Sequence, residues 1–379
     1  MPYTAPGDVV RVEDGKLAEI VSPGPHRATP VCRHFGTCGG CALQHLDEQT
    51  YRTFKRDLVI QALAQRGIEN PTVNAPIVVA PKTRRRAALK AAKKNGETKI
   101  GFNARASHAI VDMHECHVLT PELFALTAKL RPLMHSLLRE GENADLHITQ
   151  ADNGFDLSLK MRRANAPAVV SQIAQRAQQM GIVRVTSGAE PLAEFETPHL
   201  RIANVDIRLP PGCFLQPTRE AELALQALVL EAAGNARNIA DLFCGIGTFA
   251  LPLAARARVH AADSDGAMID ALTTAARAIQ GVKPLTPERR DLFRRPLLPG
   301  ELNKFDTIVL DPPRAGAAAQ IEQIAKSKAA RVIYVSCNPA SFARDARTLI
   351  DGGYKLGPVT PVDQFLWSAQ LELAAYFER

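Results

Sequence analysis

Apolar and polar positions follow different patterns in the two halves of the chain. Residues 47–66 repeat apolar side chains at helical spacing after Asp47, which predicts a helix capped by Asp47. Residues 71–112 alternate as strands do, residues 121–140 return to helical spacing, and two strand-like runs flank a turn sequence at 152–154. These elements predict an α+β fold for the first half.

The pattern changes near residue 206, where short apolar runs begin to alternate with helical stretches. A helix is predicted at 218–233. The next apolar runs cover 238–243, 258–262, 305–310 and 331–335, and two strand-like runs follow near 356–363 and 370–377. This alternation is typical of a doubly wound parallel sheet, so we expect an α/β fold for this half.

Length and composition narrow the class of protein. The chain has 379 residues, enough for two or three domains, and 46% of them are hydrophobic, enough for packed cores. No apolar run approaches the ~18 residues that a membrane helix needs. The first residues, Met1 to Thr4, lack the basic and apolar regions of a secretory signal. We therefore expect a cytoplasmic, soluble protein that does not enter a membrane.

Basic residues outnumber acidic residues, and they are unevenly distributed. The formal net charge is +7, which favours a polyanionic partner. The segment Lys82–Lys94 holds seven basic residues and no acid. We expect this segment to contact nucleic-acid phosphates, with a solvated surface as the alternative.

A glycine-containing turn follows the first apolar run of the second half, within residues 241–249. Gly245 and Gly247 allow a tight strand-to-helix turn and the close approach of a ligand to the backbone. Asp263 ends the next apolar run, where a carboxylate can bind both ribose hydroxyls of a nucleotide-like ligand. Asp265 competes for that role, but Asp263 follows the run directly and is preferred.

Three polar residues at later strand ends predict an active site in the same crevice. Asp311 is followed by two prolines, which stiffen the turn that holds it. Cys337 lies just past a buried strand and precedes Asn-Pro, so its thiol should face the crevice, where Arg314 or Arg344 would lower its pKa. Glu372 interrupts an apolar strand, where an acid would otherwise be costly, and it is the candidate base. An outward-facing strand position is its alternative.

A thiol and a base together suit methylation of a pyrimidine. Carbon 5 of uracil is a poor nucleophile, but thiolate attack at carbon 6 makes carbon 5 nucleophilic towards a sulfonium methyl donor. A base then removes the carbon 5 proton, and elimination releases the thiol. The pocket must admit an unstacked base.

Four cysteines predict a metal site in the first half. Cys32, Cys38 and Cys41 lie close together in a glycine-rich loop, and Cys116 follows at a distance. Zinc would favour two knuckle-like pairs of ligands, so this spacing favours an iron–sulfur cluster over zinc. Nearby histidines are alternative ligands.

Together these motifs resemble the family of RNA 5-methyluridine methyltransferases, in its iron–sulfur ribosomal RNA branch. The resemblance extends from about residue 1 to the end of the chain. It is carried by Cys32-Arg-His-Phe-Gly-Thr-Cys-Gly-Gly-Cys-Ala-Leu-Gln-His45, Phe214-Leu-Gln216, Asp241-Leu-Phe-Cys-Gly-Ile-Gly247, Asp311-Pro-Pro-Arg-Ala-Gly316 and Ser336-Cys-Asn-Pro339.

The resemblance implies a role for each of these groups of residues. Cys337 would be the nucleophile and Glu372 the base, and a [4Fe-4S] cluster would be bound by Cys32, Cys38, Cys41 and Cys116. The S-adenosylmethionine site would be lined by Gln216, Phe243, Gly245, Asp263 and Asp311, with Thr248 and Asp291 as weaker additions. Because the transfer-RNA branch generally lacks the cluster, 23S ribosomal RNA is the expected substrate.

The resemblance also suggests a domain organisation. Residues 1–30 would be the truncated remnant of an RNA-binding barrel, residues 31–205 an iron–sulfur and central α+β domain, and residues 206–379 a Rossmann-like methyltransferase domain. The chain departs from the family at Gln370, where His is frequent, and at Thr248, where Asn is frequent. We expect a monomer.

Two alternatives stay open at this point. One is a methyltransferase of the same fold that acts on a transfer-RNA uridine or on carbon 5 of cytosine. The other is a non-catalytic RNA-binding protein whose iron–sulfur cluster is structural.

Overall fold

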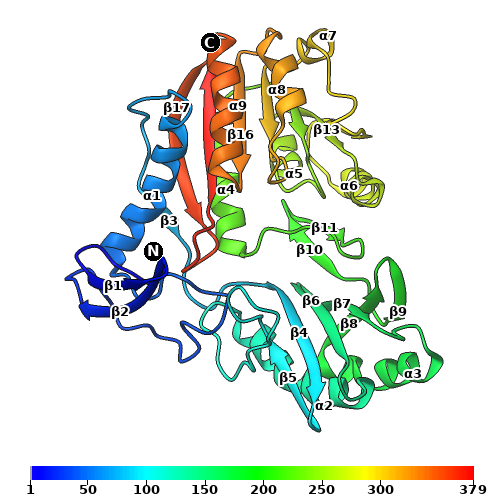
Figure 1. The fold of residues 1–379 in the computed structure, drawn as a ribbon. Helices are drawn as coiled ribbons and strands as arrows, with labels where there is room; N and C mark the ends of the chain where they lie inside the picture. The colour runs from blue at the N-terminus through cyan, green and yellow to red at the C-terminus, as the bar shows by residue number, and fades with distance from the viewer. Residues whose placement is uncertain (1) are drawn as a thin grey trace. The chain divides into compact units, whose positions relative to one another are not determined.

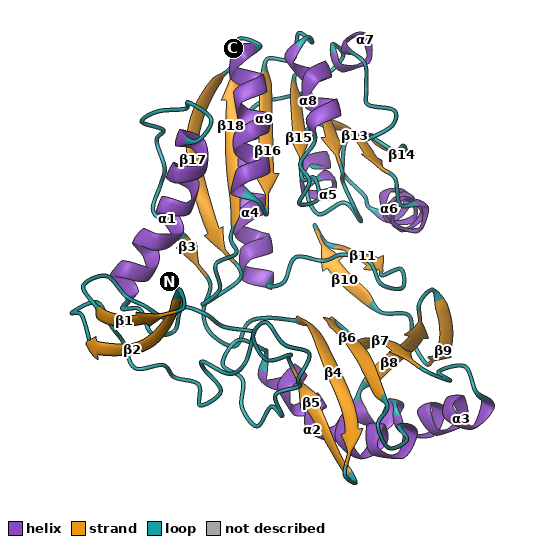
Figure 2. Ribbon diagram, viewed as in Figure 1, coloured by secondary structure: helices purple, strands orange, loops and turns teal. Residues whose placement is uncertain are grey.

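The chain forms two compact units, each assembled from several segments, in a computed structural model that describes residues 2–379 (Figures 1 and 2). The first unit comprises the chain up to Phe54, Ala80–Pro198 and Phe365–Ala369. The second comprises Lys55–Val79, His199–Gln364 and Gln370–Arg379. The expected domains 1–30, 31–205 and 206–379 stay a prediction of the sequence.

An eight-stranded sheet organises the second unit, in the order β14-β13-β12-β15-β16-β18-β17-β3. Its strands are β3 (Ile77–Val78), β12 (Asn238–Leu242), β13 (Arg258–Asp263), β14 (Leu285–Arg289), β15 (Thr307–Leu310), β16 (Arg331–Ser336), β17 (Lys355–Asp363) and β18 (Glu372–Glu378). Neighbouring strands are parallel except that β18 runs antiparallel to β16 and β17. The predicted α/β fold of this half is therefore confirmed, with one reversed strand.

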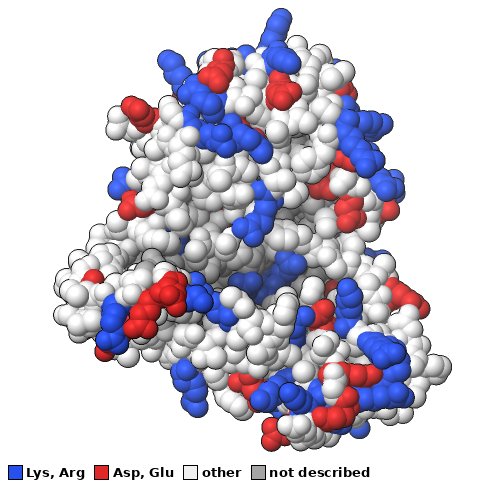
Figure 3. Space-filling model, viewed as in Figure 1, with Lys and Arg blue, Asp and Glu red and all other residues white. Residues whose placement is uncertain are grey.

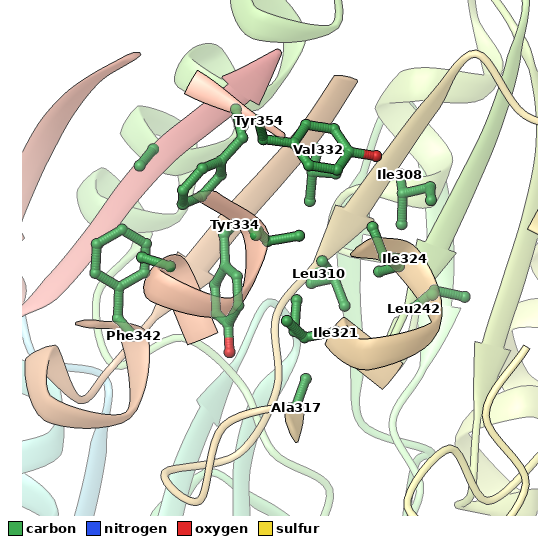
Figure 4. Close-up of a cluster of buried hydrophobic side chains, with 14 of the residues drawn as sticks. Leu242, Ile308, Leu310, Ala317, Ile321, Ile324, Val332, Tyr334, Phe342 and Tyr354 are labelled. Atoms are coloured by element: carbon green, nitrogen blue, oxygen red, sulfur yellow. The ribbon is translucent and has the colours of Figure 1, made fainter. Parts of the chain in front are cut away.

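Helices pack against this sheet and enclose an apolar core. They are α1 (Glu48–Ala64), α4 (Arg219–Ala233), α5 (Ala250–Ala254), α6 (Gly266–Ala278), α7 (Pro299–Leu302), α8 (Ala318–Ala325) and α9 (Pro339–Asp351). Side chains of α8 and α9 meet those of β12, β15 and β16 in the core, where Tyr334 and Phe342 are fully buried (Figure 4). A short ladder of β10 (His199–Ile202) and β11 (Val205–Arg208) completes this unit.

The turn after β12 depends on glycine at one position in particular. Gly247 has φ +93°, a left-handed conformation that L side chains rarely adopt. A Cβ there would also lie 2.5 Å from Leu272 Cδ1. The glycine is therefore needed for the chain to enter α5 beside α6, which fixes the crevice above β12.

The first unit contains a six-stranded sheet in the order β5-β4-β6-β7-β8-β9. Its strands are β4 (Arg86–Lys94), β5 (Glu97–Gly101), β6 (Asn143–Ala151), β7 (Gly154–Met161), β8 (Ile182–Ser187) and β9 (Glu190–Glu194). It also contains α2 (Pro121–Leu137), α3 (Pro167–Arg176), the 3-10 turn η1 (Gln178–Met180) and a separate hairpin of β1 (Val9–Glu13) and β2 (Lys16–Ser22).

Several predicted elements of the first half are confirmed. α1 covers most of the predicted helix, and Asp47 accepts a hydrogen bond from the Thr50 backbone at 2.7 Å. β6 and β7 pair as a hairpin, with Ala151 opposite Gly154. No helix within residues 2–379 combines the length and apolar character that crossing a bilayer requires.

Candidate active site and cysteine cavity

The C-terminal edge of the β15–β16–β18 region brings the predicted catalytic side chains together. Asp311 follows β15, Cys337 follows β16, and Glu372 begins β18. Ser336 pairs with Leu373 across the antiparallel β16–β18 ladder, so the residues one step further, Cys337 and Glu372, are neighbours. The chain order reverses between β12 and β15, which is where open α/β sheets bind ligands.

Glu372 is buried rather than outward-facing. Its side chain is 3% exposed, and Oε2 accepts a hydrogen bond from Gln364 Nε2 at 2.6 Å. Burial raises its pKa well above the ordinary value, and the charge of Asp311 raises it further, while the Gln364 hydrogen bond acts in the opposite direction. A carboxyl group with a raised pKa can accept a proton near neutral pH.

Cys337 is half-buried beside the same carboxylates. Burial raises the pKa of its thiol to about 11, with further contributions from Glu372 and Asp311, and Arg314 opposes them. Arg344 instead pairs with Asp345 at 2.7 Å. Of the two arginines that the sequence proposed as activators, Arg314 is therefore the one that acts on the thiol.

Asp311 connects this group to the C-terminal end of β12. Burial and the charge of Asp263 raise the pKa of Asp311 to about 7. Its Oδ2 accepts a hydrogen bond from Gln216 Nε2 at 3.3 Å, and its backbone N–H donates to Leu242 at the end of β12. Asp241, one residue before Leu242, is fully buried and its pKa is raised well above the usual value, chiefly by burial and by Asp311.

Asp263 holds the glycine turn from the neighbouring strand. Its Oδ2 accepts a hydrogen bond from Gly245 N, and its Oδ1 accepts one from Asp265 N, each at 3.0 Å. Asp265 caps α6 instead, because its Oδ1 accepts from Ala267 N at 2.9 Å and Met268 N at 3.1 Å. Asp265 therefore serves as a helix cap, and the role of Asp263 toward a ligand stays a prediction.

Two aromatic rings lie beside the glycine turn. Phe243 has φ +63°, and its ring centroid lies 5.3 Å from that of Phe293. Phe293 is 47% exposed. Asp291 accepts hydrogen bonds from Phe293 N and Arg294 N, so it shapes the loop that presents this ring. Exposed aromatic surface beside a nucleotide-like crevice suits stacking against a base.

Sequence reasoning missed Asp241, Phe293 and Gln364 as site residues. Asp241 carries a signal in the sequence, since an acid within an apolar run just before a glycine turn is costly unless it is used. Phe293 and Gln364 lie in loops with no periodic pattern, so only their spatial neighbours identify them.

The four predicted ligand cysteines line one cavity in the first unit. Cys32, Cys38, Cys41 and Cys116 all face it, and all are free thiols. Gly39 N donates to Asn103 O at 2.9 Å, and a Cβ on Gly39 would lie 2.9 Å from that oxygen, so the loop can approach so closely only with glycine.

N–H groups surround the sulfur atoms of this cavity. Gly40 N donates to Cys38 Sγ at 3.4 Å, and backbone N–H groups of His34 and Leu119 hold down the pKa values of Cys32 and Cys116. Burial nevertheless raises the pKa of all four thiols, in Cys41 to about 12, and the thiols raise one another. These shifts favour the protonated thiols, and the binding of a metal centre by the four cysteines stays a prediction.

The thiols of this cavity are not grouped as a ready-made site for one metal ion. In the described part of the chain no three His, Cys, Asp or Glu side chains are placed to hold one ion. The choice between an iron–sulfur cluster and zinc therefore stays a prediction of the sequence.

The basic segment Lys82–Lys94 is not one uniform solvated face. Arg85 is buried, Lys90 forms an ion pair with Asp145, and Lys93 donates to the His135 carbonyl at 2.9 Å. Lys82 and Lys94 are exposed. Figure 3 shows basic side chains spread over the visible surface with acidic ones among them. Only part of the segment is thus available to phosphates.

The sheet order, the glycine turn and the polar strand ends define a Rossmann-like, S-adenosylmethionine-dependent methyltransferase. The same fold occurs in the tRNA (uracil-54, C5)-methyltransferase of Pyrococcus abyssi, solved with S-adenosyl-L-homocysteine. Its TM-score is 0.74 at 22% identity, over 99% of this chain and 94% of that one.

Sequence relatives identify the family. The tRNA (Uracil-5-)-methyltransferase family model matches residues 193–379. An uncharacterized RNA methyltransferase of Brucella suis is 44% identical over 99% of this chain and 91% of its own length. The 23S rRNA (uracil(1939)-C(5))-methyltransferase RlmD of Vibrio vulnificus is 30% identical, over 96% and 85% respectively. The chain belongs to the RNA uracil-C5 methyltransferase family, as the resemblance implied.

Proposed function

We propose that this enzyme methylates carbon 5 of a uridine in 23S ribosomal RNA through a covalent adduct between Cys337 and carbon 6, with Glu372 as the base. The observation that carries the proposal is the meeting of Cys337, Glu372 and Asp311 at one sheet edge, where each carboxylate acts on the thiol. No other cysteine of the second unit has this setting in the described residues, because Cys213 and Cys244 are buried.

The reaction is balanced by the two side chains. The Cys337 sulfur forms a bond to carbon 6, and the ring electrons move to carbon 5. S-adenosylmethionine, when bound, supplies an electrophilic methyl group to that carbon. Glu372 then takes the proton from carbon 5, the sulfur–carbon bond breaks, and the Cys337 thiolate leaves with the restored double bond behind it.

The charges of the site suit these steps. Glu372 and Asp311 oppose ionisation of Cys337 in the free protein, so the thiolate is a minor species before substrates bind. A raised pKa also makes Glu372 a stronger base once it is ionised. Arg314, held by its hydrogen bond to Gln370 Oε1 at 2.9 Å, supplies the positive charge that favours the thiolate.

The crevice above β12 is the proposed S-adenosylmethionine site. Gln216, Phe243, Gly245, Asp263 and Asp311 would line it, and Asp291 would contribute through the loop that carries Phe293. Support comes from the hydrogen bonds that link Asp263 to Gly245 and Gln216 to Asp311. A positive sulfonium would also be favoured by the neighbouring carboxylates.

We also propose that Cys32, Cys38, Cys41 and Cys116 bind a [4Fe-4S] cluster. The four thiols line one cavity, and Cys38 Sγ accepts a hydrogen bond from Gly40 N. Iron–sulfur clusters are bound by four thiolates, and hydrogen bonds to the sulfurs tune them. The cluster takes no part in the methylation steps, which transfer no single electrons.

The choice of 23S ribosomal RNA rests on the relatives. The Vibrio relative acts on 23S rRNA, whereas the family of the matching model and the Pyrococcus enzyme are both named for tRNA. The Vibrio relative covers most of both chains, and its sequence identity to this chain is higher than that of the Pyrococcus enzyme. A four-cysteine site is also what the resemblance implies for the ribosomal branch. A transfer-RNA target is the competing outcome of the test.

A methylation assay tests this proposal directly. Purified enzyme is incubated with labelled methyl donor and either undermethylated 23S rRNA or bulk tRNA. We expect 5-methyluridine after nuclease digestion of 23S rRNA, and its loss in Cys337→Ala. Cys213→Ala, which removes a buried thiol of the same unit, should keep activity. Label confined to tRNA would contradict the substrate, and full activity of Cys337→Ala would contradict the mechanism.

A separate measurement tests the cluster. Protein purified without oxygen should carry about four irons and four sulfides per chain and absorb broadly in the visible range. Cys116→Ala should lose this iron. A colourless oxygen-free preparation with one zinc per chain would contradict the cluster.

A further inference from the structure

Two glutamine side chains join two carboxylates in a continuous hydrogen-bonded chain inside the second unit. Gln364 Nε2 donates to Glu372 Oε2 at 2.6 Å and to Gln216 Oε1 at 2.8 Å. Gln216 Nε2 then donates to Asp311 Oδ2 at 3.3 Å. The chain therefore runs from the proposed base to the proposed cofactor site through two amides.

The carboxylates fix the orientation of both amides. In the ionised state that a base requires, Glu372 can only accept hydrogen bonds, so Gln364 presents its NH2 group to it in that state. The second hydrogen of that group goes to Gln216, which must then present its oxygen to Gln364 and its nitrogen to Asp311. Reversing Gln364 would place its oxygen against two acceptors.

This orientation leaves one atom of Gln364 without a partner. The side chain is 1% exposed, and no described residue donates a hydrogen bond to its Oε1. A buried polar atom without a partner is costly and calls for a functional explanation. The cost is accepted here because both hydrogens of the amide are used for the bonds to Glu372 and Gln216.

The backbone around Gln364 is held firmly. Asp363, the last residue of β17, forms a fully buried ion pair with Lys55 at 2.7 Å. Lys55 Nζ also donates to the Gln370 carbonyl, two residues before Glu372. Gln364 N donates to Val362 O at 3.2 Å. One lysine thus fixes Asp363, which precedes Gln364, and Gln370, which lies two residues before Glu372.

Few groups other than Gln364 set the charge of Glu372. Asp311 faces it from the end of β15, and Cys337 faces it from the end of β16. Arg314 acts on Cys337 and donates a hydrogen bond to Gln370. Lys55 and Asp363 lie on adjoining elements, and the charges of this pair cancel. Gln364 supplies the hydrogen bond that favours the ionised form of Glu372.

We propose that Gln364 is a positioning residue that holds Glu372 as an oriented carboxylate and couples it, through Gln216, to the cofactor site. This inference rests on the proposed function of Glu372 as the base. It adds a residue to which sequence reasoning gave no role, and it assigns to that residue the resolution of the covalent adduct rather than its formation.

The test is Gln364→Met, which keeps the side-chain length and removes both donors. We expect the acid limb of the single-turnover rate to move to higher pH by about one unit, because the carboxylate loses its stabilising donor. Below that limb the rate should fall about tenfold. Methyl-labelled RNA should also remain bound to the protein on a denaturing gel, since the carbon 5 proton leaves more slowly.

Gln320→Met is the matched control. Gln320 is also a fully buried glutamine of the second unit, but its amide is bonded to the Leu297 backbone. It should lower the thermal midpoint without moving the pH limb or trapping RNA. Gln364→Glu, which keeps the shape and replaces the NH2 group by oxygen, should move the limb at least as far as Gln364→Met if the latter folds poorly.

The outcomes separate this inference from the proposed function. An unchanged pH limb and no trapped RNA in both Gln364 variants, with Cys337→Ala inactive, would overturn the role of Gln364 and leave the mechanism intact. Activity of Cys337→Ala would overturn the mechanism and with it the role of Gln364. A moved limb together with trapped labelled RNA supports the proposal.

Discussion

The cysteine cavity of the first unit and the sheet edge of the second both hold thiols with raised pKa values, but their surroundings differ. Burial raises the pKa of the Cys41 thiol to about 12. The neighbouring thiols add to this shift, and a hydrogen bond with the Gln44 side chain opposes it. Burial raises the pKa of the Cys337 thiol to about 11. Two carboxylates add to this shift, and Arg314 opposes it. The cavity of the first unit groups four thiols together. The sheet edge of the second unit places one thiol beside two carboxylates and an arginine.

This difference indicates how a protein assigns a thiol to binding or to catalysis. Four thiols in one cavity oppose one another's ionisation, so they stay protonated unless a bound positive group stabilises all the thiolates together. A thiol between carboxylates and an arginine instead changes its ionisation as substrates arrive and protons move. Each prediction below perturbs one region and leaves the other as its reference.

The largest expected effect is that of Glu372→Gln on turnover. A general base contributes about 10²–10⁴-fold, so methyl release should slow by that factor while the first bond to RNA still forms. Quenched reactions resolved on a denaturing gel should show a labelled protein–RNA species. Iron content should be unchanged, because the cysteine cavity holds none of the altered groups.

Rapid turnover by Glu372→Gln would contradict this view of the sheet edge. Loss of both turnover and adduct, together with normal folding, would show that Glu372 acts before bond formation and not after it.

The second effect concerns stability and compares ion pairs in the two units. Lys55 and Asp363 are both fully buried, and Lys55→Met removes the cation from Asp363. We expect a loss of about 3–5 kcal/mol in the free energy of unfolding, measured by denaturant titration. Lys90→Met breaks the partly exposed pair with Asp145 in the first unit and should cost about 1 kcal/mol or less.

The double variant Lys55→Met with Asp363→Asn checks the cause. Removing both charges should recover part of the loss, since no buried carboxylate then lacks its cation. Equal losses in Lys55→Met and Lys90→Met would contradict the difference in burial.

The sequence predicts the chemistry of the sheet edge better than its architecture. Asp311, Cys337 and Glu372 are detectable because each stands at the end of an apolar run, where a polar side chain is costly without a use. The parallel strands β12, β13, β15 and β16 follow from the same runs. The antiparallel course of β18 does not, since an apolar run carries no direction.

Other features depend on contacts that no local pattern encodes. α3, β8 and β9, within residues 167–194, were not predicted, although Val169 and Ile173 of α3 stand at helical spacing. Gln364 is recognised only by its hydrogen bonds to Gln216 and Glu372. Gln216 lies far from it in sequence, and Glu372 lies on the next strand. Arg85 lies in a basic segment yet is buried.

The third effect is on thiol reactivity. Glu372→Gln removes a carboxyl group whose ionisation opposes that of Cys337, so the pKa of Cys337 should fall and its alkylation by iodoacetamide at pH 8 should become several-fold faster. Arg314→Met should do the opposite. Peptide mass spectrometry of iron-free protein follows Cys337 and Cys41 together, and Cys41 should react at the same rate in all three proteins.

The smallest effect concerns RNA affinity and tests what remains of the basic segment. Lys82 and Lys94 are its exposed lysines, whereas Lys90 and Lys93 are engaged within the first unit. If Lys82 and Lys94 contact phosphates, replacing each by Ala should reduce the slope of log affinity against log salt by about one. Lys328→Ala, an exposed lysine of the second unit, is the control. An unchanged slope in the Lys82 and Lys94 variants would assign the segment to a solvated surface, so that RNA recognition would have to come from other residues.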